Sequence, residues 1–271
     1  MATHPPIALV FAATDPTGGA GLQADVLTLA SHGCHPASVV TALTVQDTHG
    51  VRHVQAVEAH WVDQQARALL EDLPVAAFKL GVLGSAENVA VIAAILAEHP
   101  DVPVVLDPVL ASARGDVLAS EATIAALREL LLARTTVLTP NSREARQLAG
   151  APETFELAEC AQRLISRGSA YVLITGTHEP GAEVVNTLYG AAGAVQVARW
   201  ERLAGSYHGS GCTLASAIAA QLASGLQVPE AVRAAQAYTW RSLASGFRPG
   251  SGQALPDRFF WAREMRHEVE P

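Results

Sequence analysis

The sequence has 271 residues, a length that fits one large domain or two small ones. Hydrophobic residues make up 49% of the chain and charged residues 16%, so the composition provides ample material for a buried core and excludes an intrinsically disordered chain. The formal net charge is −8, which argues against nucleic acid and anionic membranes as partners, because both attract basic surfaces.

Apolar segments of strand length alternate along the chain with longer, alanine- and leucine-rich segments of helical period. The predicted strands are Ile7–Ala13, Ala37–Val45, Ala76–Val82, Val102–Val109, Thr136–Thr139, Tyr171–Thr175, Val184–Tyr189 and Val195–Trp200. The predicted helices are Gly21–His32, Ala59–Leu73, Ala86–Glu98, Glu121–Ala133, Glu156–Arg167, Thr213–Ala223 and Glu230–Ser245. Near-continuous apolar strands are typical of parallel sheets that helices cover on both faces.

This alternation predicts an α/β fold, a three-layer α/β/α sandwich with a mostly parallel central sheet. The last two predicted strands are separated only by turn residues, Gly190 to Gly193, which indicates an antiparallel hairpin at a sheet edge. Neither a low-complexity linker nor an internal repeat divides the chain, so we expect residues 1–271 to form a single domain. We expect the aromatic segment Phe259–Trp261 to pack back on that domain.

Cysteine spacing and the first residues argue against secreted, zinc-binding and membrane proteins. The chain has three cysteines, Cys34, Cys160 and Cys212, with no C-x-x-C pair, and its ten histidines form no H-E-x-x-H motif. The segment Met1–Pro6 has no lysine or arginine, and the apolar run Ile7–Ala13 is too short for a signal peptide or a membrane span. We therefore expect a soluble, cytoplasmic protein.

The segment Gly209-Ser210-Gly211-Cys212 precedes an alanine-rich helix and is the sharpest motif in the chain. Two glycines allow close approach of the backbone to a ligand, and the first amides of a helix lack partners within the helix. Together with the helix dipole, these amides favour an anion such as phosphate. A glycine-rich helix start without a ligand is the structural alternative.

A second cluster, Thr14–Asp25, follows the first predicted strand at a position where open α/β sheets usually bind ligands. Within it, GAGLQA matches G-x-G-x-x-A, and Asp47 follows the next strand, so a dinucleotide-binding oxidoreductase is an alternative. The spacing argues against that alternative. Five residues, one of them a proline, separate the strand from Gly19, whereas the dinucleotide fingerprint begins at the end of the strand.

Acidic and amide side chains also occur at other strand ends. Asn141 and Glu144 follow a predicted strand, where they can form a helix capping box or orient a hydrated magnesium ion. Asp107 ends another strand and could join that magnesium site. The only lysine of the chain, Lys79, lies in a predicted strand, where it either serves the site or packs its stem with its head at the end of the sheet.

Six stretches together resemble the hydroxymethylpyrimidine/phosphomethylpyrimidine kinases of the ribokinase-like superfamily. They are TDPTGGAGLQAD (14–25), VTALTVQDTHGV (40–51), KLGVLG (79–84), VVLDPVL (104–110), LTPNSREA (138–145) and HGSGCTL (208–214). The resemblance implies a ribokinase-like sandwich without a lid domain, and usually a homodimer. It also implies transfer of the γ-phosphoryl group of ATP to 4-amino-5-hydroxymethyl-2-methylpyrimidine, and then to its monophosphate, in thiamine biosynthesis.

The same resemblance implies roles for individual residues. Substrate-binding residues would be Asp25 and Gln46 at the pyrimidine edge, with Ala13 and Val82 as walls of its ring. Phosphoryl-binding and catalytic residues would be Gly209, Gly211 and Cys212, and residues on the side of ATP would be Asn141, Glu144, Thr175 and Ser210. Magnesium would be held by Glu144 and Asp107.

Cys212 stands where most relatives on this scaffold place an aspartate that takes the hydroxyl proton of the substrate. A helix N-terminus favours a thiolate, so we expect Cys212 either to accept that proton or to hold the hydroxyl in line with the γ-phosphorus. The family pattern usually has Gly at Ala13, Met at Val82, Lys at Thr175 and Asn-Thr at Ser206-Tyr207. Pyridoxine and pyridoxal kinases share the scaffold and are an alternative, as is a non-catalytic binding protein.

Overall fold

The computed structural model describes residues 4–112 and 115–267, and in this part the alternating segments form one nine-stranded sheet with helices on both faces. The strands are β1 Ile7–Ala13, β2 His35–Gln46, β3 Val51–Ala56, β4 Val75–Leu80, β5 Val104–Leu106, β6 Val137–Leu138, β7 Tyr171–Thr175, β8 Glu183–Gly190 and β9 Gly193–Glu201. The helices are α1 Gly21–Ser31, α2 Ala59–Asp72, α3 Ala86–Glu98, α4 Glu121–Ala126, α5 Ser142–Ala149, α6 Leu157–Ser166, α7 Ser210–Ala223, α8 Val228–Ala244 and α9 Phe260–His267.

The strand order is β3-β2-β1-β4-β5-β6-β7-β8-β9. Neighbours from β2 to β7 are parallel, whereas β3 at one edge and β8 and β9 at the other are antiparallel. The β8–β9 hairpin was expected from the sequence. Strand β3 was missed, because VRHVQA contains no apolar run and pairs with β2 as a half-exposed edge.

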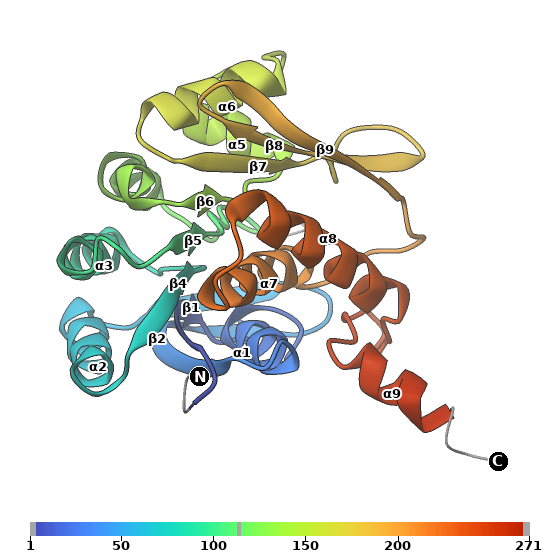
Figure 1. The fold of residues 1–271 in the computed structure, drawn as a ribbon, viewed down its shortest axis with the longest axis horizontal. Helices are drawn as coiled ribbons and strands as arrows, with labels where there is room; N and C mark the ends of the chain where they lie inside the picture. The colour runs from blue at the N-terminus through green and yellow to red at the C-terminus, as the bar shows by residue number, and fades with distance from the viewer. Residues whose placement is uncertain (1–3, 113–114, 268–271) are drawn as a thin grey trace.

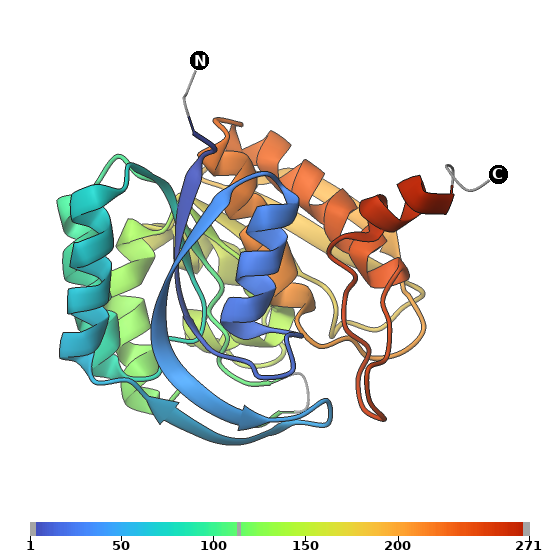
Figure 2. The ribbon, with the colours of Figure 1, turned by 90° about the horizontal axis from the view of Figure 1, so that it is seen from below.

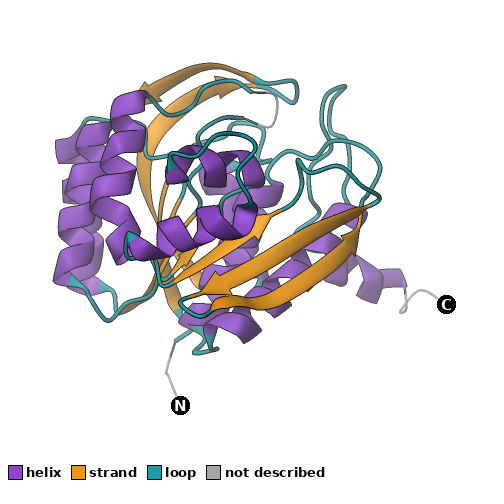
Figure 3. Cartoon of the chain, turned by 90° about the horizontal axis from the view of Figure 1, so that it is seen from above, coloured by secondary structure: helices purple, strands orange, loops and turns teal. Residues whose placement is uncertain are grey.

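The three layers are visible in the ribbon (Figure 1). Helices α1, α7 and α8 cover one face of the sheet, and α2 to α6 cover the other (Figures 1 and 2). The strands run between these two helical layers (Figure 3). The predicted α/β/α sandwich is therefore confirmed.

Strand β1 shows how the sequence divides the core between the two faces. Ile7, Leu9 and Phe11 point to the layer of α2 to α6, whereas Ala8, Val10 and Ala12 point to α7. The small side chains on the second face allow the alanine-rich helix α7 to lie close to the sheet. The start of α7 is thereby held directly above the carboxyl end of β1.

One helix boundary differs from the predicted one in a way that matters for function. Helix α7 begins at Ser210 and not at Thr213, so the glycine motif forms the first turn of the helix itself.

After α8 the chain returns to the domain, as expected for the aromatic segment. Phe260 is buried, with its ring centroid 5.6 Å from that of Tyr238, although Trp261 stays partly exposed.

Candidate active site

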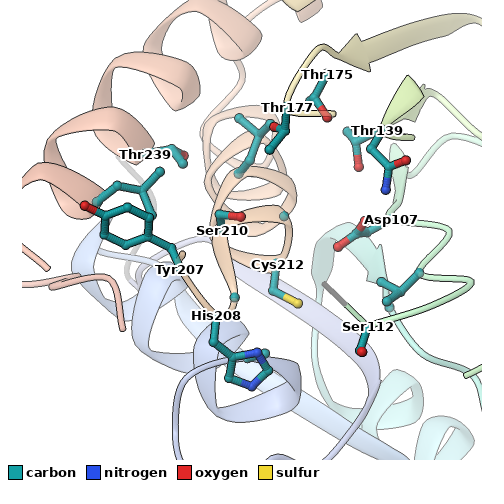
Figure 4. Close-up of a pocket in the computed structure, with 18 of the residues that line it drawn as sticks. Asp107, Ser112, Thr139, Thr175, Thr177, Tyr207, His208, Ser210, Cys212 and Thr239 are labelled. Carbon is teal, nitrogen blue, oxygen red and sulfur yellow. The ribbon is translucent and has the colours of Figure 1, made fainter. Parts of the chain in front are cut away.

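A cavity of about 580 Å³ opens at the carboxyl ends of the parallel strands, beside the start of α7 (Figure 4). Its walls include Thr14 after β1, Gly81 and Val82 after β4, Asp107 and Val109 after β5, Thr139 and Asn141 after β6, and Thr177 after β7. Ligands of open α/β sheets bind at this edge, next to the strand where the order of connections reverses. Here that strand is β1, which lies between β2 and β4.

The first turn of α7 forms the centre of the cavity. Gly209 is the N-cap residue, with φ of 88°, and no side chain caps the amides that follow it. Ser210, Gly211 and Cys212 line the cavity from this turn. Unpartnered helix-start amides and the positive end of the helix dipole suit this turn to an anion such as phosphate, which is the prediction made from the glycine motif.

Gly209 needs to be a glycine for a second reason. A Cβ atom at this position would overlap the carbonyl oxygen of Gly19, which belongs to the loop between β1 and α1. The start of α7 therefore lies directly against that loop. The left-handed φ and the close approach together exclude any side chain at Gly209.

The loop of residues 14–20 is folded around the buried carboxylate of Asp15. Asp15 accepts hydrogen bonds from the backbone amides of Thr17 and Ala20, at 2.8 and 2.7 Å, and from Nε2 of His208 at 2.8 Å. Burial alone would raise the pKa of Asp15, but these hydrogen bonds outweigh it and hold that pKa below its ordinary value. Asp15 thus joins the loop to the residues that precede α7.

Asp25 is not a wall of the cavity, so the predicted direct contact between Asp25 and a substrate is not supported by the geometry. Its side chain is fully buried beneath the site, where Oδ2 accepts from Nζ of Lys79 at 2.7 Å and Oδ1 accepts from Oγ of Ser216 at 2.7 Å. Both carboxylate oxygens are occupied. Asp25 joins α1, β4 and α7, and its function in the structure is to hold those elements together.

Lys79 is also fully buried and lines the cavity, so the interpretation in which it serves the site stays a prediction. Burial alone would lower its pKa, but the charge of Asp25, helped by Cys212 and Asp107, raises that pKa above its ordinary value. The amine is therefore charged at neutral pH. Lys79 is one of the residues that line the cavity, and its Nζ would lie only 2.8 Å from a Cβ atom added at Gly81.

Cys212 projects from the first turn of α7 toward the side of the cavity that carries Asp107 (Figure 4). Burial raises the pKa of its thiol to about 12, even though Lys79 draws it down. The expected thiolate is therefore wrong for the protein without a ligand: loss of solvent outweighs the helix dipole, and the neighbouring acids Asp25 and Asp107 disfavour a further negative charge. The protonated thiol is a hydrogen-bond donor.

Two buried carboxyl groups lie beside the helix start. Asp107 is 4% exposed, and its Oδ2 has no hydrogen-bond partner within residues 4–112 and 115–267. Burial raises the pKa of Asp107 to about 6, and burial with the charge of Asp107 raises that of Glu144 to about 7. The charge of Lys79 lowers the pKa of Asp107, but burial outweighs it.

These two groups differ in their fitness for a metal ion. Glu144 accepts from the backbone amides of Asn141 and Leu110, at 3.0 and 3.2 Å, and completes a capping box with Asn141 at the start of α5. Asn141 and Glu144 form the capping box and also line the cavity, so the structural role and the magnesium-binding role are compatible. Asp107, with an orphaned buried oxygen, fits a magnesium ion better than Glu144 does.

No group of three or more metal-ligating side chains occurs in the described part of the chain. Magnesium is usually held by one or two carboxylates, with phosphate oxygens and water completing its octahedron. The two carboxyl groups of Asp107 and Glu144 fit a magnesium ion whose remaining ligands are phosphate oxygens and water.

Asp107→Asn is expected to stabilise the protein at pH 8 by on the order of 1–3 kcal/mol and to have little effect near pH 4. A carboxyl group whose pKa is raised on folding stabilises the folded state while it is protonated, and this contribution is lost as the pH rises through about 6. Thermal unfolding of both proteins across pH 4–8 measures the difference. Asp101→Asn, at an exposed carboxyl group, is the control, and equal effects of the two substitutions would contradict the prediction.

The residues that line the cavity include two groups that belong to opposite halves of the strand order, and we call these two parts of the cavity its arms. The first arm is lined by Ala13, Thr44, Gln46, Val51 and Val82. The second arm is lined by Thr175, Val184, Asn186, Trp200, Gln236, Thr239 and Leu243. The structure thus brings together every predicted site residue except Asp25.

The second arm contains a hydrogen-bonded group that the sequence did not indicate. Oε1 of Gln236 accepts from Nδ2 of Asn186 at 3.0 Å and from Nε1 of Trp200 at 3.2 Å. An indole nitrogen can only donate, so these contacts fix which way the amide of Gln236 points. The arm is therefore a rigid, partly aromatic space that suits a flat heterocycle.

Arg202 also lines the cavity, next to Thr175, where the family pattern has a lysine. Its guanidinium donates to the carbonyl oxygens of Thr177, Glu179, Gly181 and Glu183. Arg202 consequently holds the loop after β7 in shape. The expectation that magnesium and helix-start amides bind the phosphates where the family lysine is missing stays a prediction.

Sequence reasoning missed His208, the Lys79–Asp25 ion pair and Arg258. His208 could have been found, because it directly precedes the glycine motif. Lys79 and Asp25 are far apart in sequence, and only the tertiary fold brings them together. Arg258 lies in the tail after α8, where neither periodicity nor a motif marks it.

The fold and the site together define a small-molecule kinase of the ribokinase-like class: a glycine helix start and two buried acids between two arms of one cavity. Comparisons with known proteins agree. The sequence model of the family described as phosphomethylpyrimidine kinase matches residues 15–257. The chain is 39% identical over 251 residues to a hydroxymethylpyrimidine/phosphomethylpyrimidine kinase of Streptomyces coelicolor, covering 92% of each protein.

Solved structures give the same result. A Bacillus subtilis pyridoxal kinase in complex with ADP superimposes with a TM-score of 0.85 at 28% identity, over 95% of this chain and 99% of that one. A phosphomethylpyrimidine kinase from Clostridium difficile has a TM-score of 0.77 at 30% identity, over 88% of this chain and 99% of that one. The chain belongs to the phosphomethylpyrimidine kinase family.

Among the described residues, none of the helices combines the length and the apolar character that crossing a bilayer requires.

Proposed function

We propose that this kinase transfers the γ-phosphoryl group of ATP to the hydroxymethyl group of 4-amino-5-hydroxymethyl-2-methylpyrimidine, and then phosphorylates the monophosphate, in thiamine biosynthesis. The observation that carries the proposal is the first arm of the cavity. There Gln46 presents an amide, and Ala13 and Val82 present small apolar surfaces, next to the amides of α7. A planar ring with donors and acceptors at its edge matches this lining.

The chain performs three tasks in this reaction. Gln46, Ala13 and Val82 hold the pyrimidine, so that its hydroxymethyl group lies at the start of α7. Gly209, Ser210 and Gly211 direct amides at the phosphoryl group as negative charge shifts during transfer. Cys212 contacts the substrate hydroxyl. Its protonated thiol holds that hydroxyl in line with the γ-phosphorus, or the sulfur accepts the hydroxyl proton after it has lost its own proton.

ATP occupies the second arm in this proposal, with its base among Val184, Trp200 and Gln236 and its phosphates near Asn141 and Thr175. Asp107 and Glu144 hold Mg²⁺, which neutralises phosphate charge when bound. The support from this structure is the unpartnered oxygen of Asp107 and the raised pKa values of both acids. A cation beside these two groups would return both pKa values toward their ordinary range.

The deciding experiment is ADP release with ATP and Mg²⁺, measured for the hydroxymethylpyrimidine, its monophosphate, pyridoxine and a sugar. We expect turnover with the first two compounds. Turnover with pyridoxine alone would overturn the proposal in favour of the alternative on the same scaffold. The absence of turnover with all four compounds would indicate a binding protein.

Gln46→Ala is expected to lower kcat/KM for the pyrimidine by about 5–150-fold, because polar atoms of a buried ring edge lose a partner worth about 1–3 kcal/mol. Gln46 is half-buried, and its side-chain amide hydrogen-bonds to no other group in the part of the chain that the structure describes. KM for ATP should stay unchanged. Steady-state kinetics with both substrates varied measures the effect.

The matched control is Gln55→Ala, on the neighbouring strand β3. Gln55 is exposed, and its amide donates only to the carbonyl of Ala56, at 3.2 Å. It should leave all kinetic constants unchanged. Equal kcat/KM for the two variants would show that Gln46 is a structural residue.

We further propose a homodimer that uses the outer face of strand β2. Leu43 and Val45 are 54% and 56% exposed, and they alternate with Thr44 and Gln46, which face the cavity. Two neighbouring exposed apolar side chains on an edge ribbon favour burial against a second copy. A partner on this face would also fix the strand that carries Gln46.

The double substitution Leu43→Glu and Val45→Glu is expected to convert the dimer to a monomer in sedimentation velocity experiments. The matched control is Val195→Glu with Val197→Glu, at exposed apolar positions of β9 on the opposite edge of the sheet. That control should remain dimeric. A monomeric wild-type chain, or dissociation by the β9 variant alone, would contradict the proposed interface.

A further inference from the structure

We propose that Arg258, which lies outside the cavity, is a positioning residue for phosphoryl transfer. Its guanidinium fixes the relative position of Gly209 and the loop of residues 14–20. The kinetic part of this inference rests on the proposed function, whereas the structural part does not.

Arg258 is 4% exposed and is held in place at its own backbone. Its carbonyl oxygen accepts from Oγ of Ser31 at 2.6 Å and from the hydroxyl of Tyr238 at 2.8 Å. These contacts fix the tail after α8 against α1 and α8. The side chain therefore enters the interior from an anchored backbone.

The guanidinium bridges two segments that are distant in sequence. Its terminal nitrogens donate to the carbonyl oxygens of Gly18, at 3.3 Å, and Gly19, and its Nε donates to Oγ1 of Thr213 at 3.2 Å. The planar fork of arginine can reach such a set of acceptors in one fixed geometry, which lysine cannot do. Arg258 is thus bonded both to the loop after β1 and to the first turns of α7.

The hydrogen bonds of Arg258 reach both partners of the close contact between Gly209 and Gly19. Thr213 donates through Oγ1 to the carbonyl oxygen of Gly209 at 2.8 Å, so the relay runs from Arg258 through Thr213 to Gly209. The carbonyl of Gly19 that receives Arg258 is the group against which Gly209 packs. One side chain therefore sets the orientation of the helix-start amides relative to the loop.

Burying the charge of Arg258 without a carboxylate partner costs folding free energy, so we expect this residue to have a specific role. No described carboxylate hydrogen-bonds to Arg258, and removing a charge from water costs several kcal/mol. Burial lowers the pKa of Arg258, with Asp15 and Asp25 acting in the opposite direction from farther away. A cation behind the start of α7 also adds positive potential where phosphate would bind.

The same tail contacts the residues that lead into α7. The amide of Ala254 donates to the carbonyl of Ser206 at 3.0 Å, and the amide of His208 donates to the carbonyl of Ala254 at 2.9 Å. His208 in turn bonds to Asp15. The tail thus holds residues 206–208 and the 14–20 loop together from outside the cavity.

The test compares Arg258→Met, Arg258→Lys and Thr213→Val by kinetics and by hydrogen exchange. We expect Arg258→Met to lower kcat by about 10²-fold with KM values little changed, because misplaced groups act mainly on the transition state. Arg258→Lys should recover part of that loss, and Thr213→Val should show a smaller loss at nearly normal thermal stability. Exchange should accelerate in peptides covering residues 14–21 and 205–212.

The matched control is Arg263→Met in the same tail, which removes an exposed arginine that pairs with Asp257 at 2.9 Å. It should change neither kcat nor exchange in those peptides. Wild-type kcat in folded Arg258→Met, or unchanged exchange in both peptides, would overturn the proposal. If Arg258→Met does not fold, wild-type kcat and exchange in Thr213→Val would overturn it.

Hydrogen exchange separates this inference from the proposed function. A wild-type protein that turns over none of the tested substrates would refute the function, while faster exchange in the two peptides of the Arg258 variants would still support the structural coupling.

Discussion

Gly209→Ala is expected to lower kcat by about 10²–10³-fold, comparable to the loss of an anion-stabilising donor in other enzymes. Alanine at φ of 88° is strained, and its Cβ would overlap the carbonyl oxygen of Gly19. The start of α7 and the 14–20 loop must then separate, so the helix amides no longer point at the phosphoryl group. Steady-state kinetics and thermal unfolding measure the two consequences.

The control is Gly225→Ala, because Gly225 has the same φ of 88° and nothing lies within 4 Å of an added Cβ. It carries the backbone strain without the overlap and lies at the far end of α7, so it should lose about 1 kcal/mol of stability and keep its kcat. A Gly209→Ala enzyme as active as Gly225→Ala would show that the close contact with Gly19 is unimportant.

Cys212→Ala is expected to lower kcat by at least about tenfold, and by as much as about 10⁴-fold if Cys212, in its thiolate form, serves as general base. ATP binding should be retained, because the helix amides and the acids remain. Cys212→Asp should keep partial activity, since a carboxylate can also accept the hydroxyl proton. Kinetics of both variants with isothermal titration of ATP separates binding from catalysis, and a wild-type kcat in Cys212→Ala would contradict the role.

The raised pKa of Cys212 can be tested in the wild-type protein by the rate at which its thiol is alkylated. A thiol with a pKa of about 12 reacts slowly with iodoacetamide at pH 7, and its rate should rise with pH because the thiolate is the nucleophile. Mass spectrometry of the modified peptide gives this rate. Cys160→Ala is the control, because Cys160 is buried in the opposite helical layer and should affect neither kcat nor the labelling of Cys212. Rapid labelling at pH 7 would show a thiolate instead.

Much of the architecture was determined by local sequence. Strands β1 and β7 and helix α3 were predicted at their observed boundaries, since apolar runs and helical period record burial directly. Strand β3 escaped because an edge strand needs no apolar run, only hydrogen bonds to its neighbour. The glycine motif indicated an anion-binding helix start, because helix amides lack partners whatever the rest of the fold does.

The chemistry inside the site depended on tertiary structure. Asp25 has the sequence position of a ligand residue, yet packing turns it away from the cavity and toward Lys79. A helix dipole favours a thiolate at Cys212, but the desolvation that raises its pKa exists only once the layers close around it. Arg258 gains its partners from segments more than 200 residues away in some cases, a reach that no local pattern encodes. Burial and long-range contacts, which sequence spacing does not record, therefore decided how the predicted residues are used.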